Sequence, residues 1–337
     1  MDEPKKRVLS GMRPTGRLHI GHIESVLRNW INLQKDHDCF YFVADWHALT
    51  TDPSTKDIEY NSIEMVKDWL AFGVDPKQST VFLQSQVPEH TELSLIFSML
   101  TNIGRLERVP SFKAQLSYLA NGNEAKADEL RGTISQGFLG YPVLQAADIL
   151  IYKTDVVPVG EDQVPHIELT REIARSFNTQ YGGVFVLPEV KLSYIPKILG
   201  TDGQKMSKSY GNTISPEDSR EDIAGKVRKM VTDTNRKSKT DPGDPNACSV
   251  YDLHLIYQED ESIEIGRKCR NGEVGCFDCK SMLTGPMTDI YAAFRERRPH
   301  ILDEDVKRVL REGSERAREV ASATLQEVRH MMMLDYL

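Results

Sequence analysis

Two short segments of the chain carry residue types that handle nucleotide phosphates. The first places His19, Gly21 and His22 directly after a turn-rich stretch, 11–16, and before an apolar run. A helix predicted over 21–35 would put them at its N-terminus, where free N–H groups and the helix dipole favour phosphate oxygens. The two imidazoles share one helix face and can donate to a triphosphate, while Gly21 leaves room for the nucleotide.

The second segment is a cationic stretch far downstream. Lys205 and Lys208 stand among Met206, Ser207 and Ser209, with glycines on both sides. A mobile loop with two ammonium groups suits the stabilisation of a departing pyrophosphate. Either segment alone is a weak signal, because His pairs and Lys-Ser tracts are common on surfaces. Together, in this order, they predict a site that forms adenylates.

These segments need elements to position them, and strand-like runs alternate with helical patterns in the first two-thirds of the chain. The strand-like runs are 7–12, 39–44, 80–83 and 156–159, and the helical patterns are 21–35, 57–73, 89–101, 141–152 and 163–177. Alternation of this kind predicts an α/β fold, with a Rossmann-like parallel sheet and ligands at the carboxyl ends of its strands. The polar stretch 121–128 is predicted to be a surface loop.

After residue 212 the strand signals fade and helical patterns dominate, over 216–231, 249–258 and 303–333. We therefore expect two domains. The first, 1–210, is a catalytic domain that ends with the cationic stretch. The second, 211–337, is helical.

Composition describes an ordinary globular protein of 337 residues, 39% hydrophobic and 27% charged. No apolar run approaches the ~20 residues that span a membrane. Residues 1–7 are charged and lead straight into the first segment, so we expect no signal peptide and a cytoplasmic location. The net charge of −8 argues against promiscuous nucleic-acid binding, although a local basic surface would suffice for an RNA. The candidate residues for such a surface are Lys226, Arg228, Lys229, Arg236, Lys237, Lys239, Arg295, Arg297 and Arg298. Each of them could equally belong to a solvent-exposed helix face without a binding role.

Four of the five cysteines gather in one short stretch. They are Cys248, Cys269, Cys276 and Cys279, in the pattern C-x20-C-x6-C-x2-C. A cytoplasmic context disfavours disulfides, so metal ligation is the leading interpretation. Four thiolates suit either an iron–sulfur cluster or tetrahedral Zn²⁺. The fifth, Cys39, opens an apolar run and is expected to be a buried strand residue.

The two phosphate segments together resemble the signatures of class I aminoacyl-tRNA synthetases, and within that class the bacterial tryptophanyl-tRNA synthetases. Further stretches similar to that family are 43–48, 141–152, 157–163 and 166–178. The resemblance implies an enzyme that joins L-tryptophan to ATP as an adenylate, releases pyrophosphate, and esterifies the 3′-terminal adenosine of tRNA(Trp). It also implies a homodimer, Mg²⁺ bound with ATP, and an anticodon-binding role for the helical domain. A subset of the family carries a similar four-cysteine pattern that holds a [4Fe-4S] cluster, which favours that group over Zn²⁺.

The resemblance implies roles for single residues. The catalytic groups would be His19, Gly21 and His22 at the α-phosphate, with Lys205 and Lys208 at the β- and γ-phosphates. The ATP site would comprise Arg13, Pro14, Thr15, Gly21, His22, Gly160, Glu161, Asp162, Lys205, Met206, Ser207, Lys208 and Ser209. The tryptophan site would comprise Leu9, Ala44, His47, Tyr141, Gln145, Asp148, Ile149, Val157, Val159 and Gln163. Gln115 stands where many relatives carry an ATP-contacting lysine, so that contact is missing or supplied by Lys113 or Lys126.

By the resemblance, Asp148 is the residue that would determine which amino acid substrate binds. Tyr141, Gln145 and Asp148 share one helical face, and a carboxylate among apolar residues is costly to bury without a partner. By resemblance Asp148 accepts the indole N–H; a plainer interpretation is a surface residue paired with Lys153 or water. The same face occurs in tyrosyl-tRNA synthetases, which leaves a tyrosine enzyme as an alternative. A second alternative is a non-catalytic relative that binds RNA and senses redox state.

Overall fold

A five-stranded parallel sheet forms the centre of the molecule. The computed structural model describes residues 4–192 and 198–336. The strands are β1 (Arg7–Met12), β2 (Asp38–Val43), β3 (Ser79–Leu83), β4 (Val156–Val159) and β5 (Glu189–Leu192), in the order β3-β2-β1-β4-β5. All neighbouring pairs are parallel, which confirms the predicted sheet. The first four strands match the predicted runs to within one residue at each end, whereas β5 is mostly exposed and too short to show an apolar pattern.

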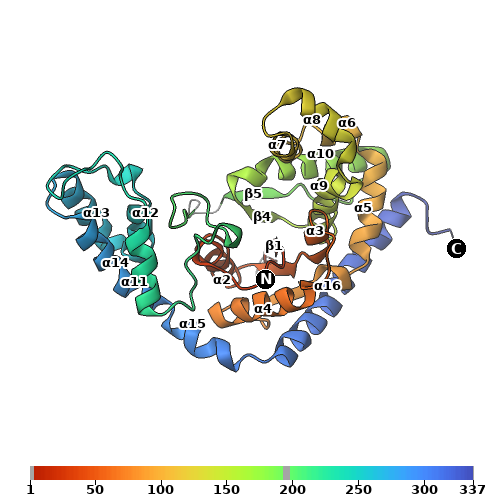
Figure 1. The fold of residues 1–337 in the computed structure, drawn as a ribbon. Helices are drawn as coiled ribbons and strands as arrows, with labels where there is room; N and C mark the ends of the chain where they lie inside the picture. Colours follow the sequence, from red (N-terminus) through yellow and green to blue (C-terminus); the bar gives the residue numbers. More distant parts are fainter. Residues whose placement is uncertain (1–3, 193–197, 337) are drawn as a thin grey trace.

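Side chains alternate between the two faces of this sheet, and those on each face belong to a separate hydrophobic core. Tyr41 and Val81 belong to one core, while Phe40 and Phe82 belong to the other. The first core is covered by α2 (Arg28–Leu33) and α4 (Ile58–Phe72). The second is covered by α5 (Glu89–Leu100), α9 (Gln136–Leu150) and α10 (Val164–Tyr181). Helices on both faces complete the predicted Rossmann-like arrangement (Figure 1).

The helix that follows β1 changes its winding near its start. It begins as α1 (Ile20–His22), continues as a π-helical turn (Ile23–Leu27), and then becomes α2. The π turn carries Glu24, a buried carboxylate that accepts hydrogen bonds from Arg28 Nε (2.5 Å) and Tyr291 Oη (2.6 Å). Single π turns inside helices often accompany functional sites. Here the turn lies directly after the predicted phosphate segment.

The segment between β3 and α9 holds three short helices, α6 (Ile103–Leu106), α7 (Pro110–Leu119) and α8 (Glu124–Leu130). The prediction of a surface loop over 121–128 is therefore wrong beyond residue 123. Asn123 starts α8 because its side chain accepts the Lys126 N–H, the usual N-cap interaction. α9 begins five residues before the predicted helix, where Ser135 caps it through the Phe138 N–H.

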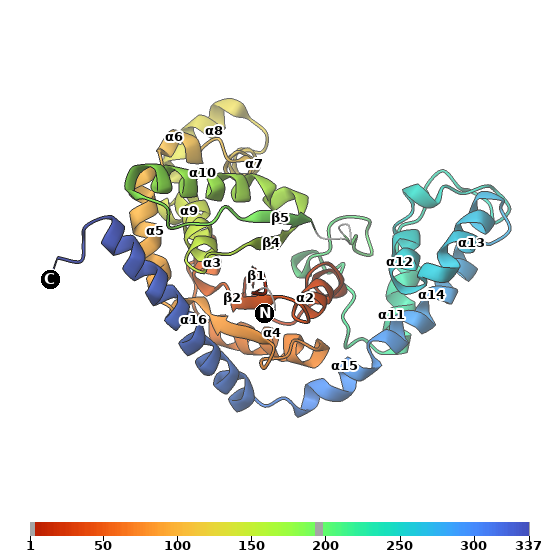
Figure 2. The ribbon, with the colours of Figure 1, turned by 180° about the vertical axis from the view of Figure 1, so that it is seen from behind.

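The predicted helical part begins after the cationic stretch. It contains α11 (Arg220–Lys229), α12 (Ser249–Tyr257), α13 (Glu259–Arg270), α14 (Cys276–Ile290) and α15 (Ala292–Arg297). Figures 1 and 2 show α11 to α14 as a lobe beside the sheet. None of the helices within residues 4–192 and 198–336 is long and apolar enough to cross a membrane.

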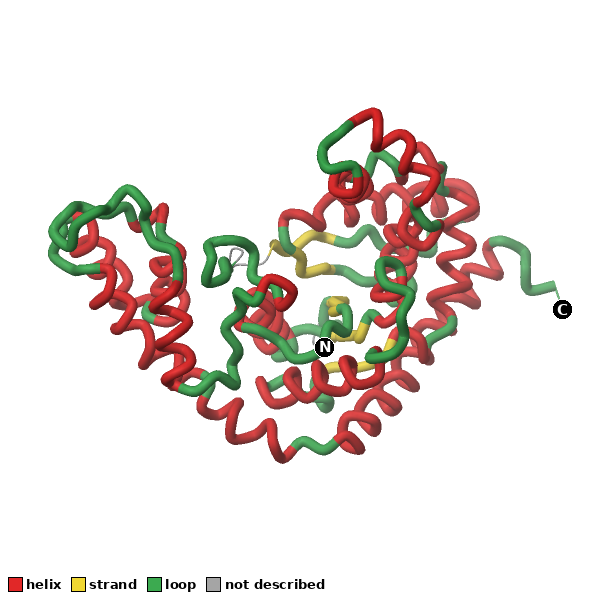
Figure 3. Tube along the Cα trace, in the orientation of Figure 1, coloured by secondary structure: helices red, strands yellow, loops and turns green. Residues whose placement is uncertain are grey.

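The last helix, α16 (Asp303–Met331), returns from that lobe to the sheet (Figure 3). Its residue Ser314 accepts the N–H of Leu83 on edge strand β3 (3.2 Å). Gly313 lies so close to that strand that a Cβ would stand 1.8 Å from the Val81 carbonyl oxygen. Further along, Ala317 and Leu325 enter the second core. The C-terminal helix thus covers the free edge of the catalytic sheet.

Candidate active site

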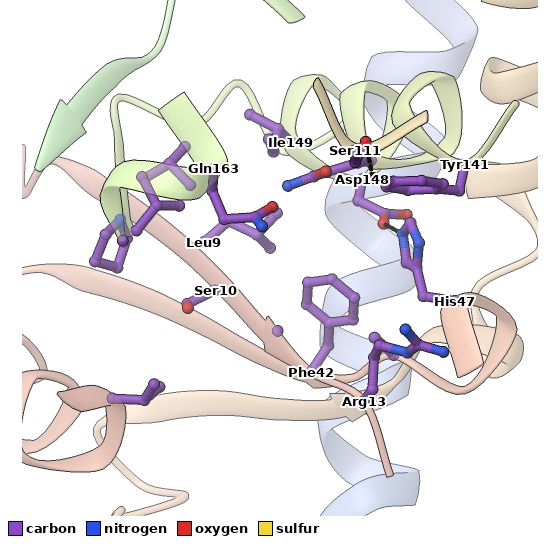
Figure 4. Close-up of a pocket in the computed structure, with 18 of the residues that line it drawn as sticks. Leu9, Ser10, Arg13, Phe42, His47, Ser111, Tyr141, Asp148, Ile149 and Gln163 are labelled. Atoms are coloured by element: carbon purple, nitrogen blue, oxygen red, sulfur yellow. Dashed lines mark hydrogen bonds and ion pairs between the residues drawn. The ribbon is translucent and has the colours of Figure 1, made fainter. Parts of the chain in front are cut away.

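A cavity of about 640 Å³ opens at the carboxyl ends of β1, β2 and β4. All of the residues predicted to surround tryptophan line it: Leu9, Ala44, His47, Tyr141, Gln145, Asp148, Ile149, Val157, Val159 and Gln163. Figure 4 shows Leu9 and Ile149 on one side of this space, and Tyr141, Asp148 and His47 on another. Phe42, Ser111 and Phe138 also line it, and the sequence did not single them out.

Asp148 is the charged group at the apolar side of the cavity. Its carboxylate is buried and accepts hydrogen bonds from His47 Nε2 (2.8 Å), His90 Nδ1 (2.5 Å) and Gln84 Nε2 (2.9 Å). Burial alone would raise the pKa of Asp148, but the hydrogen bonds from the two histidines outweigh it and lower the pKa to about 2. The interpretation of Asp148 as a surface partner of Lys153 is wrong, since Lys153 is bound to Glu327 (2.7 Å).

A second chain of hydrogen bonds borders the cavity near α9 and α10. Tyr141 Oη donates to Ser111 Oγ (2.6 Å), which lies 3.1 Å from His166 Nε2. His166 Nδ1 lies 2.8 Å from Gln163 Oε1, and Gln163 Nε2 donates to Asp162 (2.9 Å). Burial lowers the pKa of His166, so this imidazole is neutral at pH 7. The chain orients Tyr141 and Gln163 along the polar part of the cavity wall.

The two histidines of the phosphate segment face each other. Their ring centroids are 3.8 Å apart, and both Nδ1 atoms are buried without a hydrogen-bond partner among the described residues. Burial, followed by the nearby Lys208 and Lys205, lowers the pKa of His19 to about 4. Burial, His19 and the same lysines lower that of His22 to about 3. Both rings are therefore neutral.

The cationic stretch lies against this segment. Lys208 Nζ donates to the Thr15 carbonyl oxygen (2.7 Å), and Met206 is buried beside Gly21. The stretch is held from within by Asn212, a buried residue that the sequence reading missed. Its side chain accepts the Ser207 N–H (2.7 Å) and donates to the Lys205 carbonyl oxygen (3.1 Å). The structure thus joins segments separated by more than 180 residues in sequence.

Comparison with known proteins agrees with this geometry. The model of the class I tRNA synthetases for tryptophan and tyrosine matches residues 1–292. Tryptophan–tRNA ligase of Thermotoga maritima is 49% identical, covering 97% of this chain and 99% of the relative. The ligase of Aquifex aeolicus is 42% identical, covering 97% of this chain and 100% of the relative. The chain belongs to the bacterial tryptophanyl-tRNA synthetases.

Solved structures agree with that assignment. The synthetase of Campylobacter jejuni, crystallised with ADP and tryptophan, is 33% identical, covers 97% of this chain and 99% of its own, and has a TM-score of 0.79. A tyrosyl-tRNA synthetase of Archaeoglobus fulgidus, 21% identical with a TM-score of 0.69, shares the fold. The chain is accordingly a tryptophan–tRNA ligase, an ATP-dependent enzyme of the aminoacyl-tRNA synthetase group.

Most of the other residues predicted at ATP directly follow β1 or β4 in this synthetase. Arg13 and Gly160 line the cavity, and the Arg13 guanidinium donates to the Ala48 carbonyl oxygen (3.2 Å) and to Thr51 Oγ1. Pro14 lies in the connection from β1 to α1, and Glu161 opens a short 3₁₀ turn after β4. The side chain of Ser209 is outside the described part of the structure. Gln115 lines the cavity in place of a lysine, while Lys113 and Lys126 are exposed.

The four clustered cysteines of the synthetase come together in the helical lobe. Arg236 Nη1 lies 3.9 Å from both Cys269 Sγ and Cys276 Sγ, and Cys279 Sγ lies 3.2 Å from His254 Nε2. Burial, followed by the other three thiols, raises the pKa of Cys279 to about 12. Among the described residues no three His, Cys, Asp or Glu side chains are arranged to hold a metal ion, so the predicted metal site is not shown.

Several residues predicted to form a basic surface are engaged elsewhere. Arg298 is buried and bonded to Asp68 (2.6 Å) and Glu64 (2.8 Å), so its assignment to a surface patch is wrong. Lys226 is bound to Asp218 (2.6 Å), and Arg236 is directed toward the cysteines. The sequence shows these cations but not their partners, because Asp68 and Arg298 are 230 residues apart.

Proposed function

We propose that the cavity binds L-tryptophan with its indole N–H directed at Asp148. The bound amino acid reacts with ATP to give tryptophanyl-adenylate and pyrophosphate, and is then transferred to the 3′-terminal adenosine of tRNA(Trp). The observation that carries the proposal is a buried, ionised carboxylate facing an apolar cavity. An indole presents one N–H on an otherwise apolar ring, which suits a carboxylate beside apolar side chains.

The substrate carboxylate is its own nucleophile, so the protein has to align it with the α-phosphorus and balance the developing charge. His19 and His22, as neutral imidazoles, each donate one N–H to phosphate oxygens. Lys205 and Lys208 neutralise the departing pyrophosphate from the loop held by Asn212. Mg²⁺ arrives with ATP, bound to its phosphates. Tyr141 and Gln163 border the space for the substrate ammonium and carboxylate groups.

Tyrosine is the rival substrate, because a phenol O–H also donates to a carboxylate. Tryptophan is favoured by the relatives, which are tryptophan–tRNA ligases at 39–49% identity. Phenylalanine would offer Asp148 no hydrogen bond, and sites built around a hydrogen bond to the substrate reject such analogues by ~10⁴–10⁵. A non-catalytic RNA-binding role is disfavoured by the complete set of phosphate-facing groups, His19, His22, Lys205 and Lys208.

ATP–pyrophosphate exchange with tryptophan, tyrosine and phenylalanine tests this proposal. We expect exchange with tryptophan alone. Asp148→Asn should lower kcat/KM for tryptophan by ~100-fold or more, because the amide presents N–H groups to donors that are already directed at this position. The exposed Asp36→Asn is the matched control and should leave exchange unchanged. Exchange that depends on tyrosine would contradict the proposal and show that the pocket binds tyrosine, as in tyrosyl-tRNA synthetases.

The helical lobe is the proposed anticodon-binding part, within a division into a catalytic domain, 1–210, and a helical domain, 211–337. We also propose a homodimer. Its support is a set of exposed apolar side chains on α5 and α6, namely Leu95, Met99 and Ile103. Sedimentation equilibrium of the wild type against a triple Leu95→Glu, Met99→Glu, Ile103→Glu variant tests it; a monomeric wild type would contradict it.

For the four cysteines we propose a [4Fe-4S] cluster, with Zn²⁺ as the alternative. The proposal is supported by the soft all-thiol donor set and by the Arg236 guanidinium, which would offset the negative charge of ligating thiolates. Bound there, the group would tie Cys248 at the start of α12 to Cys269 in the last turn of α13 and to Cys276 and Cys279 in the first turn of α14. Iron, sulfide and zinc analysis of anaerobically purified protein distinguishes the two groups.

Loss of the four-cysteine site should affect transfer to tRNA more than adenylate formation. Cys279→Ser is expected to lower tRNA charging several-fold while leaving tryptophan-dependent pyrophosphate exchange largely intact, because the cysteines belong to the lobe and not to the cavity. Cys39→Ser, a buried cysteine of β2, is the control for a general effect of thiol loss. Equal loss of both activities in Cys279→Ser would contradict this division.

A further inference from the structure

His90 lies behind the cavity and not in its wall. It is fully buried in α5, and its ring packs against Tyr152 with the centroids 5.3 Å apart. Its Nδ1 atom is 2.5 Å from Asp148 Oδ1, while Nε2 is 2.6 Å from Tyr152 Oη. Neither His90 nor Tyr152 is among the residues that line the cavity. Both therefore act on a ligand only through Asp148.

The order of donors along this chain follows from the chemistry of its members. Burial, followed by Asp148, raises the pKa of Tyr152 well above its usual range, so the phenol keeps its proton. That hydroxyl donates to Nε2 of His90, which leaves the ring proton on Nδ1, facing the carboxylate. Tyr152 thus fixes the tautomer in which His90 donates to Asp148.

A count of acceptor positions shows what this donor achieves. A carboxylate offers about four lone-pair directions. His90 Nδ1 and Gln84 Nε2 contact Oδ1, while His47 Nε2 and the same Gln84 nitrogen contact Oδ2, so each carboxylate oxygen already has two contacts. The Gln84 amide turns its N–H toward Asp148 although its Oε1 then has no partner among the described residues, which fits an ionised carboxylate. Because one Gln84 nitrogen is shared by both oxygens, the two histidines are the donors that fix the rotation of the carboxylate.

We propose that His90, held by Tyr152, is a positioning residue for tryptophan selection. It keeps Asp148 ionised and holds its carboxylate in one rotation, in which both oxygens share the Gln84 nitrogen and the indole N–H replaces one of these shared contacts. The inference rests on the proposed function of the cavity. Its consequence is that discrimination between rings with and without an N–H depends on a side chain that contacts neither substrate.

The test compares L-tryptophan with L-3-benzothienylalanine, in which sulfur replaces the indole N–H. The readout is the ratio of kcat/KM for the two substrates in pyrophosphate exchange, with the KM for ATP measured alongside. His90→Leu removes the donor. His90→Asn restores an N–H near the Nδ1 position. Tyr152→Phe removes the hydroxyl that fixes the ring proton of His90 on Nδ1. The matched control is Tyr41→Phe, because Tyr41 is also buried and its hydroxyl donates to the Trp30 carbonyl oxygen.

We expect His90→Leu to lower the ratio by ~10-fold or more, through a higher KM for tryptophan with little change in the KM for ATP. His90→Asn should stay within ~3-fold of the wild type, Tyr152→Phe should fall between the two, and Tyr41→Phe should match the wild type. Equal losses with both substrates, or no rescue by asparagine, would overturn the inference.

If His90→Leu does not fold, Tyr152→Phe decides, and an unchanged ratio in that variant overturns the proposal. A wild type that shows no tryptophan-dependent exchange contradicts the proposed function itself. A wild type that exchanges with tryptophan while the variants keep its ratio contradicts only the role of His90.

Discussion

At the scale of single residues, the phosphate site works with neutral histidines. Burial and two nearby lysines lower the pKa of His19 to about 4 and that of His22 to about 3. The lysines carry the positive charge, while the imidazoles supply directed N–H donors. In the proposed site, charge neutralisation by the loop 199–212 would thus be separate from orientation by the start of the helix.

The same pKa values predict how stability depends on pH. In the unfolded chain these histidines titrate near 6.5, so between pH 6.5 and about 4 the unfolded state binds protons that the folded state does not. The free energy of unfolding therefore falls as the pH is lowered through this range. Urea unfolding at pH 7.5, 6.5 and 5.5 should show a shallower fall for His22→Asn than for the wild type.

The exposed His300→Asn gives the reference for losing a histidine at the surface. Equal pH dependence of the unfolding free energy in His22→Asn and the wild type would contradict the lowered pKa of His22.

At the scale of elements, the loop 199–212 is built around one buried amide. Asn212 contacts the loop through the Ser207 N–H and the Lys205 carbonyl oxygen, and also donates to Asp202 (2.8 Å). Gly200 lies so close that a Cβ would stand 2.5 Å from the Asn212 side chain. These contacts hold the loop that carries Lys205 and Lys208 in one shape.

Asn212→Ala should loosen this loop without touching the tryptophan pocket. We expect kcat for pyrophosphate exchange to fall ~10-fold, because the lysines lose their fixed geometry, while the KM for tryptophan stays near the wild-type value. Steady-state exchange kinetics measure both, and the exposed Asn32→Ala serves as control. A raised KM for tryptophan with unchanged kcat would assign Asn212 a different role.

Some of these elements could be predicted from the sequence and others could not. The four apolar strands and the phosphate segment after β1 were predictable, because burial on both faces leaves strong apolar runs and the switch from strand to helix fixes the site. Helix α8 was not, since its start depends on an Asn123 cap inside a polar stretch. His90 was not either, because a histidine inside a helical pattern looks the same whether it contacts a carboxylate or solvent.

At the scale of the whole molecule, a buried ion cluster joins the two parts of the chain. Arg298, at the exit from the helical lobe, bonds to Asp68 and Glu64 of α4. Asp68 also accepts the N–H of Leu18 (2.7 Å), the residue directly before His19. The lobe and the phosphate segment are thus bonded to the same carboxylate.

Replacing Arg298 should be costly because it removes the ion-pair partner of the buried Asp68, whereas Glu64 keeps Arg17 and Lys67. Arg298→Met is expected to lower the free energy of unfolding by ~3–5 kcal/mol, whereas the exposed Arg308→Ala, which loses an ion pair on α16, should cost less than ~1 kcal/mol. Denaturant unfolding measures the difference. A value for Arg298→Met as small as that of the control would mean that solvent reaches the cluster.

The contact between α16 and β3 determines when the sheet edge is covered during synthesis of the enzyme. Strand β3 ends at residue 83, but the helix that covers its free edge starts at residue 303. During translation this edge stays open until α16 has left the ribosome, more than 200 residues after β3, and it exposes backbone groups on which other strands pair. A nascent chain that stalls before residue 303 is left with an unprotected sheet edge, which the synthesis of α16 then covers.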